Sequence, residues 1–191
     1  MVDNQIKQLF GSWLQAIGTF IAAVGATPSP ILSDQQLNNL SLIGNVLQAI
    51  GNALIADTID QFNLEKIGNE IQAIGNSTVV SGMVLPVNNI TSQELIIKGN
   101  WLQALGGFAA IGDGFDQLEQ PGEAINVISN LLQGIGNSLQ AIGGIKQLRS
   151  GNQEDGEFEQ VLGSWIQTVG SVLGALEVTK ETYSPDTDES S

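Results

Sequence analysis

The side chains that could do chemistry in this 191-residue chain are nearly all carboxylates. Three of them, Asp113, Asp116 and Glu119, recur at every third position, so a helical turn would present them together and could hold a hard cation weakly. A second group, Glu154, Asp155, Glu157 and Glu159, superficially resembles a calcium loop, but a loop of the EF-hand type would need acidic residues where Gly151 and Leu162 stand. We therefore interpret both groups as solvated turns with favourable charge at a helix N-terminus.

The residues and motifs that most other kinds of catalysis require are absent from the chain. The chain has no Cys and no His, which excludes disulfides, thiol catalysis and imidazole acid–base chemistry. Its serines have no histidine base, and no Gly-Lys-Ser/Thr phosphate loop occurs. We predict a non-enzymatic protein with no catalytic residue, no cofactor, no metal and no small-molecule substrate.

Charge and composition narrow the class of partner. The net charge is −14 with only 6 Lys and Arg, so no basic face is available to bind nucleic acid, and an anionic membrane surface is disfavoured. Hydrophobic residues make up 42% of the chain, which is typical of a globular protein with a core. Charged residues make up only 14%, and amides, Ser, Thr and Gly fill the difference. We expect much of the surface outside the core to be polar but uncharged.

The element that must position all of these residues is a repeated octet, Gly-[Asn/Ser]-x-[Leu/Ile]-Gln-[Ala/Thr]-[Ile/Leu/Val]-Gly. Its copies are Gly11–Gly18, Gly44–Gly51, Gly68–Gly75, Gly99–Gly106, Gly136–Gly143 and Gly163–Gly170, with a seventh, Ser129–Gly136, that begins with Ser. Apolar residues precede the first glycine by one position and follow it by three and six, as in Phe10, Leu14 and Ile17. Steps of four and three indicate a helix with one apolar stripe. A β-solenoid is the alternative, but it would need alternation with a period of two.

Helix breakers separate the octets, for example Pro28–Pro30, Pro86 and Pro121-Gly122. The expected helices lie near 4–25, 34–56, 61–82, 92–111, 122–149 and 156–181. Ser33–Gln36 and Thr91–Glu94 both fit the capping box that starts a helix. We predict an all-α fold of about six antiparallel helices, in a close-packed helical bundle or repeat array. One helical repeat domain covers 1–183, and a disordered acidic tail covers 184–191.

The glycines of each octet form a track along one edge of the apolar stripe, with the Gln just beyond it. A track without side chains lets a neighbouring backbone come close, and the Gln can then hydrogen-bond the neighbour's carbonyls or its equivalent Gln. Each interior glycine costs roughly 0.5–1 kcal/mol relative to Ala, so isolated helices should be weak. The predicted packing and interaction residues are Gly11, Gly18, Gly44, Gly51, Gly68, Gly75, Gly99, Gly106, Gly136, Gly143, Gly163 and Gly170, with Gln15, Gln48, Gln72, Gln103, Gln140 and Gln167.

The octets resemble those of small repetitive, glycine-rich proteins of Bacillus-type bacteria, a group with no established activity, so the resemblance implies a source and no residue roles. A looser resemblance is to glycine-zipper peptides that act on membranes. Our first hypothesis is a structural or interaction protein whose glycine tracks mediate close helix–helix packing, with a second copy of itself as the partner. The alternative is a membrane-associated or membrane-active helical protein, because the octets carry almost no charge. Since Met1–Lys7 lacks the features of a signal peptide, we expect a cytoplasmic protein.

Overall fold

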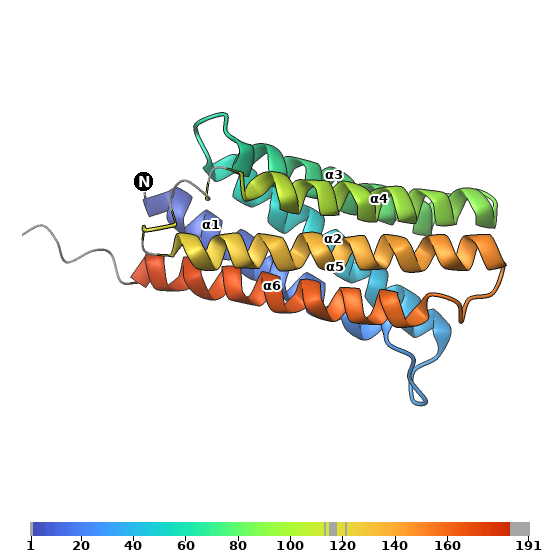
Figure 1. Ribbon diagram of the computed structural model, residues 1–191. Helices are drawn as coiled ribbons and strands as arrows, with labels where there is room; N and C mark the ends of the chain where they lie inside the picture. The colour runs from blue at the N-terminus through green and yellow to red at the C-terminus, as the bar shows by residue number, and fades with distance from the viewer. Residues whose placement is uncertain (1, 113, 115–117, 121, 184–191) are drawn as a thin grey trace, which may run out of the picture.

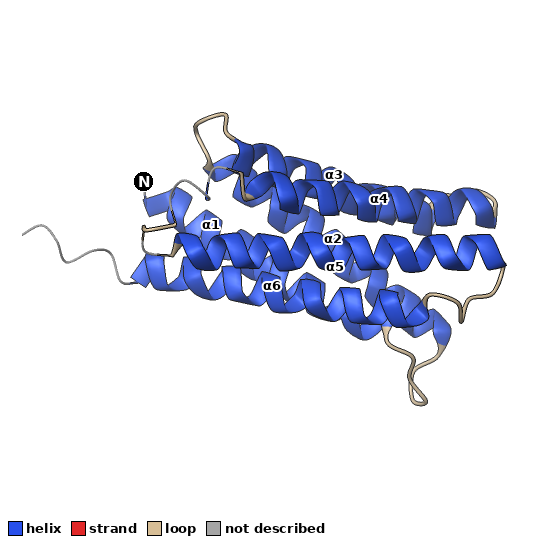
Figure 2. Ribbon diagram, in the orientation of Figure 1, coloured by secondary structure: helices blue, strands red, loops and turns tan. Residues whose placement is uncertain are grey.

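The computed structural model describes residues 2–112, 114, 118–120 and 122–183. These residues form long helices joined by short turns, as Figures 1 and 2 show. The helices are α1 (Val2–Ala26), α2 (Asp34–Thr58), α3 (Leu64–Val84), α4 (Asn89–Ala110), α5 (Glu123–Ser150) and α6 (Glu157–Tyr183). The prediction of an all-α fold with six octet-bearing helices is confirmed. The predicted tail 184–191, and Asp113 and Asp116 of the first acidic group, lie outside the described residues.

Side-chain caps decide where several helices begin. Ser33 caps α2 as predicted: its side chain accepts from the backbone N–H of Gln36, and the Gln36 side chain accepts from the backbone of Ser33. The capping box predicted at Thr91 is wrong, because Asn88 already caps α4 and accepts from the Thr91 backbone N–H at 2.9 Å. An Asn side chain can cap a helix as a Ser or Thr side chain does, by accepting from a backbone N–H of the first turn. Helix α4 therefore begins directly after Asn88, before Thr91.

The helices form a closed ring. Consecutive helices run antiparallel and pair most closely within three hairpins, α1–α2, α3–α4 and α5–α6. Between hairpins, α2 packs against α3 and α4 against α5, and α1 packs against α6 to complete the circuit. We call the end where α1, α3 and α5 begin the proximal end, at the left in Figure 1, and the other the distal end. All six helices therefore have one face toward a common interior.

Glycines set the spacing within each hairpin. A Cβ built on Gly44 would lie 2.5 Å from the carbonyl oxygen of Gly18, and one built on Gly51 would lie 2.6 Å from that of Gly11. The same reciprocal approach joins Gly68 to Gly106 in the second hairpin. Backbone atoms cannot move aside as a flexible side-chain tip can, so even an alanine would push these helices apart.

The octet amides and the apolar stripe lie on opposite sides of the ring. Gln48 and Gln72 are only 2% and 1% exposed, whereas Phe10 is 60% exposed; neutral polar residues outside the octets, such as Gln35 and Asn38, are exposed. Since glycines bring the backbones together, the narrow space inside the ring takes the Gln, Asn and Ser beside the track, and the bulky apolar stripe lies outside. Buried apolar side chains are mostly small; the alanines among them are Ala16, Ala23, Ala56, Ala104, Ala110, Ala141 and Ala175.

Candidate functional site

Side-chain amides from several helices meet at the centre of the ring. Nε2 of Gln167, on α6, donates to Oε1 of Gln48 on α2 at 2.8 Å and more weakly to Oε1 of Gln103 on α4 at 3.4 Å. Oε1 of Gln167 accepts from Nε2 of Gln140, on α5, at 2.9 Å. Gln167 is thus the hub of a cluster that ties together α2, α4, α5 and α6.

A second amide cluster lies nearer the proximal end. Nε2 of Gln15, on α1, donates to Oδ1 of Asn52 on α2 at 2.8 Å and to Oε1 of Gln133 on α5 at 2.7 Å. Gln133 itself donates to Ser129, whose hydroxyl donates to the carbonyl of Gly170 on α6 at 2.8 Å. This chain of hydrogen bonds joins four helices across the interior.

Among the described residues, four amide atoms that are fully shielded from solvent have no hydrogen-bond partner: Nε2 of Gln72, Nε2 of Gln103, Oδ1 of Asn76 and Nδ2 of Asn137. Each residue is no more than 2% exposed. Buried polar atoms without partners cost about 1–3 kcal/mol each unless water satisfies them. They mark the part of the interior where the amide network is least complete.

A cavity of about 240 Å³ opens at the proximal end and is lined by residues of all six helices. Its rim includes Glu123, the first residue of α5, and the exposed Glu181 near the end of α6. Its floor includes Gln15 and Gln133. Gln133 follows Glu123 by ten positions on one helix, so the floor lies about 15 Å below the rim.

The cavity ends at this floor. Beyond it, the cluster around Gln167 fills the centre of the ring. The distal part of the interior is occupied by small or branched apolar side chains, of which Ala23 and Ala141 are 0% exposed, Val79 is 4% exposed and Ile97 is 8% exposed. Among the described residues, the interior is therefore a polar vestibule at the proximal end, followed by an amide cluster and an apolar distal part.

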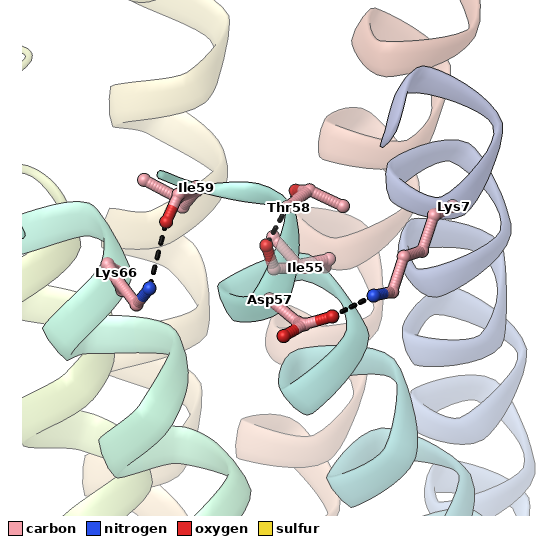
Figure 3. A network of polar contacts seen from close by, with 6 residues as sticks. All are labelled: Lys7, Ile55, Asp57, Thr58, Ile59 and Lys66. Carbon is pink, nitrogen blue, oxygen red and sulfur yellow. Dashed lines mark hydrogen bonds and ion pairs between the residues drawn. The ribbon is translucent and has the colours of Figure 1, made fainter. Parts of the chain in front are cut away.

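The vestibule is acidic. Glu65, Glu123 and Glu181 line it, and no Lys or Arg does. Of the lysines at this end, Lys7 pairs with Asp57, and Lys66 donates to the carbonyl of Ile59 at 2.9 Å. Figure 3 shows both contacts, together with the hydrogen bond from Thr58 to Ile55 that ends α2.

The third proximal lysine, Lys180, donates to the nearly buried Glu177 at 2.8 Å. Glu181 lies close to Glu177 and Glu123, and both Glu177 and Glu181 approach Gly122. A single lysine thus stands among three carboxylates on this side of the mouth. The local field there is negative, which favours cations.

Tryptophans close the ring between its first and last helices. Nε1 of Trp13, on α1, donates to Oγ1 of Thr179 on α6 at 3.0 Å. Nε1 of Trp165, on α6, donates to Oγ1 of Thr27 at 3.1 Å, and its ring meets Phe20 edge-on with centroids 5.8 Å apart. These contacts give two of the three octet tryptophans a structural role at the seam, by which we mean the contact between α1 and α6.

The outer surface is apolar over much of the ring. By length and composition, three helices could cross a membrane: α1 over Asp3–Ala26, α2 over Asp34–Thr58 and α6 over Glu157–Tyr183. They are neighbours in the order α6, α1, α2, so they form one continuous face. The exposed large hydrophobic residues of this face include Ile6, Phe10, Ile17, Phe20, Ile43, Val46, Ile50, Phe158, Leu162, Trp165, Val169 and Leu176.

The structure places the twelve predicted glycines at the contacts between helices of the same hairpin. In the third hairpin, Gly136 meets Gly163, Gly143 meets Gly156, and Gly170 meets Ser129, the residue that begins the seventh octet. The predicted Gln15, Gln48, Gln103, Gln140 and Gln167 take part in the interior hydrogen bonds, and Gln72 is buried there. The glycine tracks face helices of the same chain.

Sequence reasoning missed most of the vestibule lining, including Gln133, Asn69, Glu123 and Glu181. Gln133 is the Gln of the seventh octet, so the repeat contained its signal. Asn69 occupies the Asn/Ser position of the third octet, to which we gave no role, and no repeat marks the two glutamates. In the second acidic group, Glu154 and Asp155 are exposed in a turn, and none of the described residues form a group of carboxylates able to hold a metal.

These features define a class of protein: an all-α ring of antiparallel helices with an amide-lined interior and an apolar exterior. The model for a family of unknown function, DUF6944, matches residues 6–175, and the chain belongs to this family. Comparison with curated proteins and with solved structures found no match. The Bacillus-type source stays a prediction.

Proposed function

We propose that this chain is a membrane-embedded helical protein, with the face formed by α6, α1 and α2 in contact with lipid. The observation that supports this most directly is the reversed polarity of the ring, with amides inside and large apolar side chains outside. Monomeric water-soluble proteins rarely expose continuous apolar patches larger than a few hundred Å². In a bilayer the same arrangement is favourable, because lipid covers the apolar face and the ring shields its polar groups.

Helix lengths and charge positions agree with this proposal. Helices α1 and α2 each have 25 residues and α6 has 27, so each spans about 37–40 Å, longer than the ~30 Å hydrocarbon layer. Within α1 no charged residue follows Lys7, and in α2 none lies between Asp34 and Asp57. In α6 the interval from Glu159 to Glu177 is likewise uncharged. Charges therefore cluster at the two ends, where headgroups and water would meet them.

The other described helices, α3, α4 and α5, are not among the candidate spans. Helix α5 presents Ile128, Leu131 and Ile135 outward but Gln133 and Asn137 inward, so its average hydropathy is lowered by a face that lipid would not touch. The α3–α4 hairpin also carries the exposed Lys98–Glu94 pair. We therefore assign the deepest lipid contact to the opposite face.

This proposal favours the membrane hypothesis over the hypothesis of self-association through the glycine tracks. The glycine tracks already pack within hairpins, so a contact with a second copy would use the apolar exterior instead. That exterior also argues for a membrane location in place of the cytoplasmic one that we expected from the N-terminal sequence.

Flotation of the full chain with liposomes tests the proposal. The chain should rise with neutral phosphatidylcholine vesicles through a density gradient and stay with them after alkaline carbonate washing. Neutral lipid is the right probe because the chain is strongly acidic. A helical chain that stays in buffer as a defined oligomer, measured by light scattering and circular dichroism, would overturn the proposal and favour self-assembly through the apolar exterior.

A further inference from the structure

The vestibule has hydrogen-bond acceptors at both ends. At the rim, Glu123 and Glu181 are carboxylates in a wall whose described residues include no Lys or Arg. The three lysines near this end are engaged elsewhere, with Asp57, with the carbonyl of Ile59 and with Glu177. A ligand at the rim should therefore carry positive charge.

Deeper in the vestibule, two amide oxygens lack a donor. Gln15 uses its Nε2 for Asn52 and Gln133, and Asn69 uses its Nδ2 for the carbonyl of Glu65. Oε1 of Gln15 and Oδ1 of Asn69 accept no hydrogen bond from any described residue, although both side chains are only 7% exposed and both line the cavity. Since neither oxygen is among the fully enclosed amide atoms, both are open to the cavity and can accept from a donor group on whatever enters.

The space between rim and floor is long, and its mostly polar wall includes three apolar side chains. These are Val127, Val178 and Ile55. The floor lies about 15 Å below the rim, as the ten positions from Glu123 to Gln133 on α5 show. An extended hydrocarbon chain fits this wall, whereas a compact ion would reach only one set of acceptors.

We propose that the vestibule binds a linear diamine or polyamine, with one ammonium group between Glu123 and Glu181 and the other at the oxygens of Gln15 and Asn69. An ammonium group has three donors and no acceptor, which matches acceptors at both ends. A divalent metal is a poorer match, because the described residues contain no group of acidic side chains able to hold a metal. An anion would be repelled by the rim.

Calorimetric titration of the purified full chain tests this at about 0.15 M salt, where long-range attraction is screened. The ligands are decamethylenediamine, n-decylamine and decamethylene glycol, which share one carbon chain long enough to reach from rim to floor and carry two, one and no charges. We expect the diamine to bind about tenfold more tightly than the monoamine, and the glycol to bind weakest. The measurement uses the detergent or buffer that keeps the chain monodisperse, so its outcome does not depend on membrane insertion.

Variants separate the two ends of the site. Asn69→Leu should lower the affinity for the diamine to that for the monoamine and leave the monoamine unchanged. Glu123→Gln should weaken both amines, and Asp60→Asn, an exposed acid at the same end that does not line the cavity, should weaken neither. Circular dichroism checks that each variant is folded; if Asn69→Leu is not, the ligand series with Glu123→Gln still decides.

Three results would overturn the proposal. One is that the wild-type chain binds none of the amines. Another is that it binds the diamine no more tightly than the monoamine. The last is that Asp60→Asn weakens binding as much as Glu123→Gln does, since the acidic surface would then attract cations without using the vestibule.

Discussion

Gln167 donates to Gln48 at 2.8 Å across the interior of the ring, from α6 to α2, although α1 lies between these helices in the circuit. Both side chains are nearly buried, at 4% and 2% exposed. Side chains that meet over such a gap can do so only because the glycine contacts make the ring narrow. The hydrogen bond therefore reports on the closure of the whole ring.

Replacing the hub of the amide cluster should be destabilising, whereas replacing an unpartnered amide should not. Gln167→Leu leaves the oxygen of Gln48 and the donor of Gln140 without their partner, and we expect the free energy of unfolding to fall by about 2 kcal/mol or more. Gln72→Leu removes a donor that has no partner, so stability should stay equal or rise. Chemical unfolding of both variants in one solvent checks this, and equal losses would contradict it.

Glycines that contact the backbone of a neighbouring helix should not tolerate substitution by alanine. Gly44→Ala would place a Cβ 2.5 Å from the carbonyl oxygen of Gly18 and 2.6 Å from the backbone nitrogen of Ala22, and we expect a loss of about 1–3 kcal/mol despite better helix propensity. Gly144→Ala is the matched control, because the atoms nearest its added Cβ belong to the Ile97 side chain and not to the backbone, and moving them breaks no hydrogen bond. Thermal melting of the two variants should separate them. A Gly44→Ala chain as stable as wild type would mean that the hairpins are looser than the structure shows.

A charge on the α6–α1–α2 face should block membrane partition. Ile17→Asp, on α1, costs about 3 kcal/mol at the centre of a spanning helix, so the fraction that floats with neutral liposomes should fall several-fold. Ile74→Asp on α3 is similarly exposed but lies outside the three candidate spans, and it should matter less. Flotation of both variants beside wild type makes the comparison. Equal behaviour would show that lipid contact is not concentrated on this face.

The seam between α1 and α6 should show a measurable coupling. Trp13→Phe and Thr179→Val each remove the 3.0 Å hydrogen bond between Nε1 of Trp13 and Oγ1 of Thr179. A double-mutant cycle on unfolding free energy should give a coupling of about 1 kcal/mol. Additive losses would mean that this bond does not contribute to ring closure.

The ion pair between Lys7 and Asp57 should contribute little by comparison. Its side chains are 34% and 69% exposed, and such pairs typically contribute about 1 kcal/mol or less. Lys7→Met should therefore shift the melting temperature only slightly, and raised salt should shrink the difference further. A large, salt-independent loss would show that Lys7 has a structural role that the exposed pair cannot explain.

The sequence by itself determined the helices. Spacings of three and four around each octet predicted where they lie, and Ser33 with Gln36 marked the start of α2, because both signals act within one or two turns of the same helix. It also contained the glycine tracks, because the positions of the glycines can be identified without knowing which residues contact them. The start of α4 was misplaced because the capping box predicted at Thr91 overlooked Asn88, which the structure shows as the cap.

Only the tertiary structure decided which face of each helix is inside. The apolar stripe of Phe10 and Ile17 has the same spacing whether a protein core or lipid covers it, so periodicity cannot tell the two apart. Likewise, the acceptors of Gln15 and Asn69 and the carboxylate of Glu123 come from three helices that meet only when the ring closes. A repeat describes one helix at a time, whereas a vestibule exists only between helices.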